Sequence, residues 1–360
     1  METRIFHWAS GTGQGRVRRV TPCRRNGLTH FLTILPGRPA VLADLITRPI
    51  LLAGLSASVA TGFTTACGGA DASSRVSAGP SGFDGGAAMA YVRKQVEFGA
   101  RVPGTAAHRA AGDWLVAELR QRAETVLVQE WTHTTADGQK LPMRNILARF
   151  RPAEGRRVLY LAHWDSRPIS DRALDPAQVA LPVPGANDGA SGVAILLGVA
   201  DALKKQAPPT GVDLLFVDGE DWGNFDTNTD VLIGAYHFAE HLPDPGYAPL
   251  FGVLFDMVGD EHPVFEQELN SVRGAPEVVQ RVWTTAQRLG HGAVFTNRQG
   301  IAITDDHVPL LAKGLRVINV IDLDYPWHHT PEDTVDKVSQ ATLQLVGDVA
   351  LTVLRELPGK

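Results

Sequence analysis

Residues 158–166 read Val-Leu-Tyr-Leu-Ala-His-Trp-Asp-Ser. The first five are all apolar, and a short unbroken apolar run of this kind predicts a strand that is buried on both faces of a sheet. The run then changes abruptly to an imidazole at His163 and a carboxylate at Asp165. In open α/β sheets the ligand site lies beyond the carboxyl ends of the strands. This stretch therefore predicts the fold and also the place of its site.

The chain around it repeats the alternation of strands and helices. Strands are predicted at 126–131, 145–150, 158–162, 212–217, 250–255 and 316–321. Helices are predicted at about 88–98, 106–122, 190–206, 233–241, 276–289 and 340–357. The two earliest β runs predict an antiparallel or mixed edge. We therefore expect residues 88–360 to form one α/β domain with three layers, α/β/α, around a mixed, mostly parallel central sheet.

Composition excludes several classes of protein. Of 360 residues, 44% are hydrophobic and 20% are charged, which is close to the globular average and too apolar for a disordered chain. The net charge of -5 and the pI of about 6.2 provide no basic field for nucleic acid, so no nucleic-acid partner is expected. Two cysteines exclude a disulfide framework and a cysteine-built zinc site.

The amino-terminal segment has the pattern of an export signal. Residues 1–48 contain eight arginines and no lysine, and a mostly apolar run over 50–66 ends directly before Cys67. This resembles a bacterial lipoprotein signal, which implies removal of residues 1–66, lipidation of Cys67 and export to the cell envelope. Residues 67–87 are small and polar, which predicts a flexible tether. The alternative is a buried helix with an incidental cysteine. We expect a monomer that meets the membrane only through its lipid.

Ionisable residues follow several predicted strands of the domain. His163 and Asp165 follow the strand at 158–162, Glu220 and Asp221 follow that at 212–217, and Asp256 follows that at 250–255. Beyond the last strand lie two adjacent histidines, and a carboxylate stands in the Gly-rich turn before the helix that begins near residue 190. Because these strand ends meet at one edge, their side chains are expected to converge. Two imidazoles and three carboxylates without cysteine suit zinc or a related divalent metal.

Simpler roles are open for three of these residues taken alone. Asp188, in the Gly-rich turn, could only cap the helix that follows it. His163 could be a core histidine with satisfied hydrogen bonds, and Asp256 could be an ordinary carboxylate at a strand end.

Five motifs in order resemble the M28 family of zinc peptidases and, within it, the glutaminyl-peptide cyclotransferase branch. They are His163-Trp-Asp-Ser, Asn187-Asp-Gly-Ala-Ser-Gly, Asp218-Gly-Glu-Asp, Phe255-Asp-Met-Val-Gly and His329-Thr-Pro-Glu-Asp. The resemblance covers roughly residues 95–355 and implies a mixed sheet between helical layers. It also implies a zinc ion held by Asp188, Asp221 and His329. A second zinc ion would be held with His163 and Asp256.

The same resemblance implies roles for residues around the metal. Glu220 matches the general acid/base, since a carboxylate beside zinc but not bound to it can transfer a proton. Asp165 and Asp333 are candidates to orient an imidazole through its free N–H. His328 is the alternative to His329, because a shift of one residue in the loop would exchange their roles.

Residues 304–310, Thr-Asp-Asp-His-Val-Pro-Leu, resemble the signature of the cyclotransferase branch. This resemblance implies that Asp305 is catalytic together with Glu220 and Asp256, with which it is hydrogen-bonded, and that His307 and Trp327 line the substrate pocket. The expected reaction converts an N-terminal Gln into pyroglutamate and releases ammonia. The alternative is an M28 aminopeptidase, favoured by Asp221, where cyclotransferases usually have Glu. A third reading, from another class, is a catalytically dead, lipid-anchored binding protein.

Overall fold

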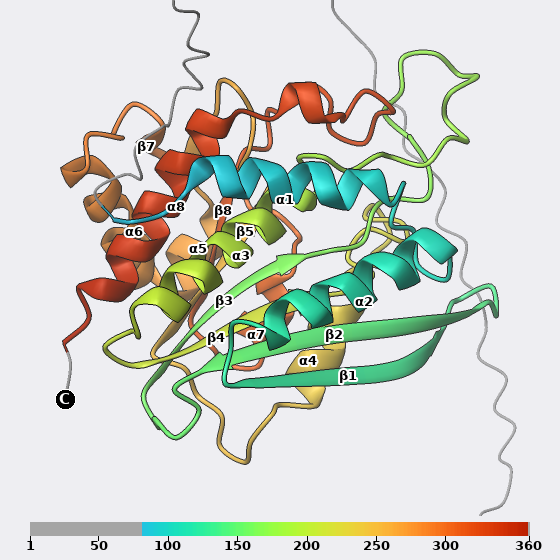
Figure 1. Cartoon of the computed structure of the whole chain (residues 1–360). Helices are drawn as coiled ribbons and strands as arrows, with labels where there is room; N and C mark the ends of the chain where they lie inside the picture. The colour runs from blue at the N-terminus through green and yellow to red at the C-terminus, as the bar shows by residue number, and fades with distance from the viewer. Residues whose placement is uncertain (1–80, 359–360) are drawn as a thin grey trace, which may run out of the picture. The chain divides into compact units, whose positions relative to one another are not determined.

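The computed structural model describes residues 81–358, and its centre is a six-stranded sheet (Figure 1). The strand order is β1-β2-β4-β3-β5-β8. The strands are β1 Thr125–Thr134, β2 Lys140–Phe150, β3 Arg157–His163, β4 Gly211–Val217, β5 Phe251–Asp256 and β8 Val317–Ile321. From β4 to β8 the strands are parallel, whereas β1 and β2 form an antiparallel edge. The predicted mixed, mostly parallel sheet is confirmed.

Helices cover both faces of this sheet (Figure 1). Along β3, Val158, Tyr160 and Ala162 belong to one hydrophobic cluster, whereas Leu159 and Leu161 belong to another. The first cluster includes residues of α1 Gly85–Glu97, α2 Ala106–Arg120, α3 Ala190–Lys205, α6 Pro276–Arg288 and α8 Gln340–Arg355. The second includes residues of α4 Ile233–Glu240 and α7 His307–Ala312. The continuous apolar strands therefore form the middle of a three-layer α/β/α fold, as predicted.

Several short elements do not appear in the sequence prediction. They are β6 Phe265–Gln267, α5 Leu269–Gly274, β7 Phe295–Gln299, α7 and a 3₁₀ turn at Val335–Lys337. Elements this short contain too few residues to show a period. The strands β6 and β7 pair with each other as a separate two-stranded sheet.

The folded domain begins earlier than the predicted boundary at residue 88. Phe83 is fully buried, and its ring packs against Gly198 of α3 and Gly347 of α8, where an added Cβ would lie within 2.5 Å of it. Asp84 caps α1 by accepting the N–H of Ala87 at 3.0 Å. Residues 81–87 therefore belong to the fold and not to the tether, because one buried aromatic ring anchors them. The predicted signal and Cys67 lie outside the described residues.

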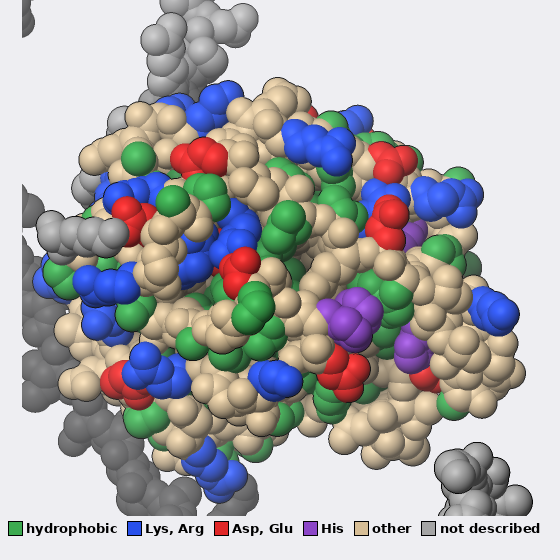
Figure 2. Space-filling view, turned by 90° about the horizontal axis from the view of Figure 1, so that it is seen from below, with side chains coloured by type: hydrophobic (Ala, Val, Ile, Leu, Met, Phe, Trp, Pro, Cys, Tyr) green, Lys and Arg blue, Asp and Glu red, His purple; other side chains and the backbone are tan. Residues whose placement is uncertain are grey.

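Within residues 81–358, no helix is long and apolar enough to cross a membrane. On the face shown in Figure 2, acidic and basic side chains lie interspersed with hydrophobic ones.

Candidate metal centre and its pocket

The candidate metal centre lies at the carboxyl edge of the parallel strands. His163 is the last residue of β3 and Asp256 the last of β5, while the loop after β4 carries Glu220 and Asp221. Helix α3 begins directly over these strand ends, because Gly192 lacks a side chain. A Cβ there would lie 2.1 Å from the carbonyl oxygen of Phe255. This close approach brings the turn before α3 to the ends of β3 and β5.

His163 lies between two carboxylates, all three of them buried. Its Nε2 is 3.0 Å from Asp188 Oδ1 and 3.2 Å from Asp256 Oδ1. Ligand atoms of these three residues lie within 4.8 Å of one another, which is close enough to share one metal ion. The group corresponds to the second predicted zinc site.

Asp188 also contributes to the other predicted zinc site. His329 Nε2 is 3.2 Å from Asp221 Oδ1 and 3.7 Å from Asp188 Oδ2. His328 Nε2 is 4.0 Å from Asp188 Oδ2, and it too forms a possible ligand group with Asp188 and His329. Because His329 contacts both carboxylates of the predicted set, the geometry favours His329 over His328 as the ligand.

The charges of this cluster fit a divalent cation. Asp188, Asp221, Asp256 and Glu220 are each at most 6% exposed, and uncompensated buried carboxylates are costly. Although burial lowers the pKa of His329, the charge of Asp221 and a hydrogen bond to Asp171 raise it to about 9. Asp221 Oδ2 is buried without a hydrogen-bond partner in the described structure. A metal ion would supply the missing positive charge and a partner for this oxygen.

The simpler roles of Asp188, His163 and Asp256 do not agree with their contacts. The N-cap of α3 is Gly189, and no side chain caps this helix, so Asp188 is not a helix cap. His163 Nε2 contacts both Asp188 and Asp256. An isolated core histidine or an ordinary strand-end carboxylate would not make these contacts. All three side chains belong to one site.

Asp165 and Asp333 both accept backbone N–H groups around the site, and of the two only Asp165 lies near an imidazole among the described residues. Asp165 Oδ1 is 3.5 Å from His163 Nδ1, and its two oxygens accept the backbone N–H groups of Glu220 and Asp221 at 3.2 and 3.3 Å. Asp333 contacts no imidazole in the described chain. It accepts the N–H groups of Asn187 and Asp188 and the hydroxyl of a buried tyrosine, so it fixes the turn that carries Asp188.

The carboxylate that orients His329 is Asp171, which the sequence prediction missed. Its Oδ1 is 3.2 Å from His329 Nδ1. Arg167 links Asp171 to Asp221, with Nη1 2.9 Å from Asp221 Oδ1. The available signal was the run of charged residues in the loop directly after β3. This signal is weak, because most charged loop residues face solvent.

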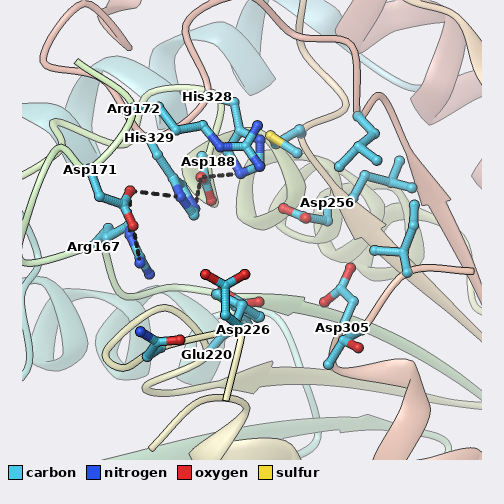
Figure 3. A pocket seen from close by; sticks show the side chains of 17 residues that line it. Arg167, Asp171, Arg172, Asp188, Glu220, Asp226, Asp256, Asp305, His328 and His329 are labelled. Atoms are coloured by element: carbon cyan, nitrogen blue, oxygen red, sulfur yellow. Dashed lines mark hydrogen bonds and ion pairs between the residues drawn. The ribbon is translucent and has the colours of Figure 1, made fainter. Parts of the chain in front are cut away.

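A pocket of about 440 Å³ opens beside the metal centre and contains Glu220 and Asp305 (Figure 3). Burial and the neighbouring charge of Asp221 raise the pKa of Glu220 well above its ordinary value. Among the described residues, the carboxyl of Glu220 makes no side-chain hydrogen bond and comes no nearer than 4.0 Å to His163 Nδ1, so it is free to exchange a proton. A carboxyl with a raised pKa suits general acid/base catalysis near neutral pH.

Three predicted details of the pocket differ from the structure. Asp305 lines the pocket, but it accepts from Asn319 Nδ2 and from the N–H of Asp306, not from Glu220 or Asp256. His307 is fully buried, 3.0 Å from Glu268, and does not line the pocket. Trp327 is 37% exposed and lies outside the pocket against Lys337. The extra residue His328 takes a place in the lining instead.

A buried carboxylate–imidazole cluster at this edge of an α/β sheet, beside a glutamate free to exchange protons, defines a metal-dependent enzyme. The sequence model of peptidase family M28 matches residues 145–354, more than half of the chain, and the chain therefore belongs to this family. A solved relative, a Zn-dependent exopeptidase from Parabacteroides distasonis, is 39% identical, with a TM-score of 0.74. That match covers 76% of this chain and 99% of the relative.

Relatives with two activities share this fold. The glutaminyl cyclase of Bacteroides thetaiotaomicron is 35% identical, with a TM-score of 0.74, over 77% of this chain and 99% of that protein. Aminopeptidase YwaD of Bacillus subtilis is 26% identical over 67% of this chain, which spans about half the length of that relative (49%). The comparisons therefore agree with both a cyclase and an exopeptidase.

Proposed function

We propose that this protein is a zinc-dependent glutaminyl-peptide cyclotransferase, which converts N-terminal glutamine of peptides or proteins into pyroglutamate and releases ammonia. Asp305 carries this proposal, because it adds a carboxylate to the pocket that contains Glu220 and Asp256. Besides burial, the charge of Asp305 helps to raise the pKa of both neighbours, that of Asp256 to about 7. The charge of Asp305 therefore favours the protonated form of Glu220, the form that can donate a proton.

In this reaction the α-amine of the substrate attacks the carbonyl carbon of its own side-chain amide. The ring C–N bond forms, and the bond to the leaving nitrogen breaks. Zinc held by Asp188, Asp221 and His329 would polarise that carbonyl as a Lewis acid. Glu220 accepts the proton that the amine loses and donates it to the departing ammonia. No water is consumed, and the reacting groups already belong to one molecule.

Substitution of Asp305 separates the two candidate activities. In a cyclotransferase, Asp305→Ser should lower the rate of pyroglutamate formation by about 10²-fold, because Glu220 loses a neighbour that supports its proton transfer. In an aminopeptidase the same change introduces the residue that is typical of that branch, and it should be tolerated. The measurement is mass spectrometry of a Gln-Ala peptide after incubation with each protein.

The products distinguish the reactions directly. Loss of one ammonia from the intact peptide supports cyclisation, whereas free Gln and Ala indicate hydrolysis. Asp175→Ser, at an exposed loop position, is the matched control and should behave as the wild type. The cyclotransferase proposal is wrong if the wild type yields only free amino acids and Asp305→Ser is equally active.

The aminopeptidase is the second candidate, and one observation favours it. His163, Asp188 and Asp256 form a second possible metal group that shares Asp188 with the first. Two adjacent metal ions are typical of hydrolases that activate water, including aminopeptidases. A dead binding protein would need no acid–base group beside the metal centre, so turnover of either kind excludes it.

We also propose that the protein is exported and anchored to the cell envelope through a lipid on Cys67. The apolar run before Cys67 and the small, polar residues after it support this proposal. Intact-mass analysis of protein from native membranes should find a lipidated chain that begins at Cys67. Cys67→Ser should abolish this species, whereas the control Cys23→Ser should preserve it. A mature chain that still contains Arg48 contradicts the proposal.

A further inference from the structure

Arg167 is a buried arginine whose guanidinium contacts two carboxylates beside the metal centre, Asp171 and Asp221. Its side chain is 3% exposed. Nη1 donates to Asp221 Oδ1 at 2.9 Å and to the carbonyl oxygen of Asp221 at 3.2 Å. Nε and Nη2 donate to the two carboxylate oxygens of Asp171, with a distance of 3.0 Å for Nε. One guanidinium thus engages two carboxylates at once, which only its planar fork of donors allows.

These contacts complete a closed ring of four side chains. From Arg167 the ring passes to Asp171, then to Nδ1 of His329 at 3.2 Å. His329 Nε2 lies 3.2 Å from Asp221 Oδ1, which returns to Arg167. Figure 3 shows Arg167, Asp171 and His329 together on one side of the pocket, with Asp188 beyond the imidazole. Two members of the ring, Asp221 and His329, are predicted zinc ligands.

We propose that Arg167 is a positioning residue that sets the Asp221–His329 half of the zinc site. It engages Oδ1 of Asp221, the oxygen that lies 3.2 Å from His329 Nε2, and so fixes how this carboxylate faces the imidazole, while Oδ2 has no partner in the described structure. Through Asp171 it also holds the imidazole of His329 with Nε2 directed at the ligand cluster. A residue that hydrogen-bonds to a metal ligand fixes the orientation of that ligand. Loss of such a residue typically lowers metal affinity by about 10–100-fold.

The other half of the centre is held differently. His163 Nδ1 lies near Asp165, and no arginine among the described residues contacts His163 or Asp256. The effect of Arg167 should therefore be confined to zinc bound by Asp188, Asp221 and His329. This inference depends on the zinc centre and not on which reaction the enzyme catalyses. Zinc binding without substrate therefore tests it separately from the proposed function.

The test is a zinc titration of the full chain against a competing chelator. Arg167→Met should weaken the zinc held by Asp221 and His329 by about 10–100-fold. Arg172→Met is the matched control, because it removes the same charge from an exposed arginine that lines the same pocket and makes no side-chain hydrogen bond or ion pair among the described residues. The control should bind zinc as the wild type does. Wild-type zinc affinity in Arg167→Met overturns the proposal.

Arg167→Lys distinguishes positioning from charge. A lysine restores the charge but cannot reach both oxygens of Asp171 and Asp221 together. We expect zinc affinity to stay about 10-fold weaker and the visible spectrum of the cobalt(II)-substituted protein to differ from that of the wild type. Full recovery of affinity and spectrum by lysine means that charge alone suffices, and it overturns the positioning role.

Asp171→Asn keeps the proposal testable if Arg167→Met does not fold. The Asp171 side chain is 34% exposed, so its substitution leaves no fully buried unpaired charge. It should weaken zinc binding by a similar factor. Where both single variants fold, the double variant should lose little more than Arg167→Met alone, because the effect of Asp171 on His329 depends on its contact with Arg167. Wild-type zinc affinity in Asp171→Asn, or fully additive losses, contradicts the ring.

Discussion

Asp188→Ala is expected to abolish stoichiometric zinc binding and, with it, activity. Asp188 contributes to both possible ligand groups, so its removal leaves each group one ligand short. Its carboxylate is 3.0 Å from His163 and 3.7 Å from His329, and it therefore connects the two halves of the centre. Zinc supplies several kcal/mol to catalysis, and each 1.4 kcal/mol corresponds to a factor of ten in rate. We expect a loss of at least about 10³-fold.

Zinc content after gel filtration and the rate with a Gln-Ala peptide measure this outcome. Asp226→Ala is the matched control for zinc content, because Asp226 lies in the same pocket but is exposed and contacts neither ligand group. It should retain full zinc. An Asp188→Ala protein with full zinc occupancy would mean that the ligand set is wrong.

Glu220→Gln is expected to keep zinc but lose most of the activity. Gln has the shape of Glu but cannot accept a proton, so kcat should fall by about 10²–10⁴-fold in either candidate reaction. Glu220 lies 4.0 Å from His163 Nδ1, which is not the nitrogen that contacts Asp188 and Asp256, so the zinc content should stay at the wild-type level.

Two measurements on the same preparation check this prediction: zinc content and single-turnover kinetics with excess enzyme. Glu240→Gln, an exposed substitution on α4, controls for the general effect of the change and should preserve kcat. If Glu220→Gln lost zinc in proportion to its activity, Glu220 would be a ligand and not the proton carrier.

Much of the fold could be predicted because long buried elements have a clear local pattern. The run at 158–162 forms the centre of β3, and the helix predicted at 190–206 ends at Lys205. Both are continuous, apolar and bounded by polar residues, so their type follows from the sequence. The boundary of the domain was missed, because Phe83 is a single aromatic residue among small ones and only its burial between α3 and α8 reveals its role.

The site could be predicted in part, for a geometric reason. Parallel strands end at a common edge, so His163, Asp256 and the loop with Glu220 must meet there, whatever the details of their loops. By contrast, Trp327 and His307 were assigned to the pocket from a motif, and both lie outside its lining. One extra residue in a loop, His328, changes which side chain faces the pocket.

The three-layer fold, the edge that carries the site and the residue types at that edge follow from the amino-acid sequence alone. Strand direction and apolar pattern are local properties, and they suffice for these conclusions. Only the tertiary structure decided that Asp171, and not Asp333, orients His329, and that Arg167 joins Asp171 to Asp221. Asp171 and Arg167 lie in one irregular loop, and the residues that they contact, His329 and Asp221, lie in other loops far along the chain. Their side-chain directions depend on how distant segments pack and not on any local period.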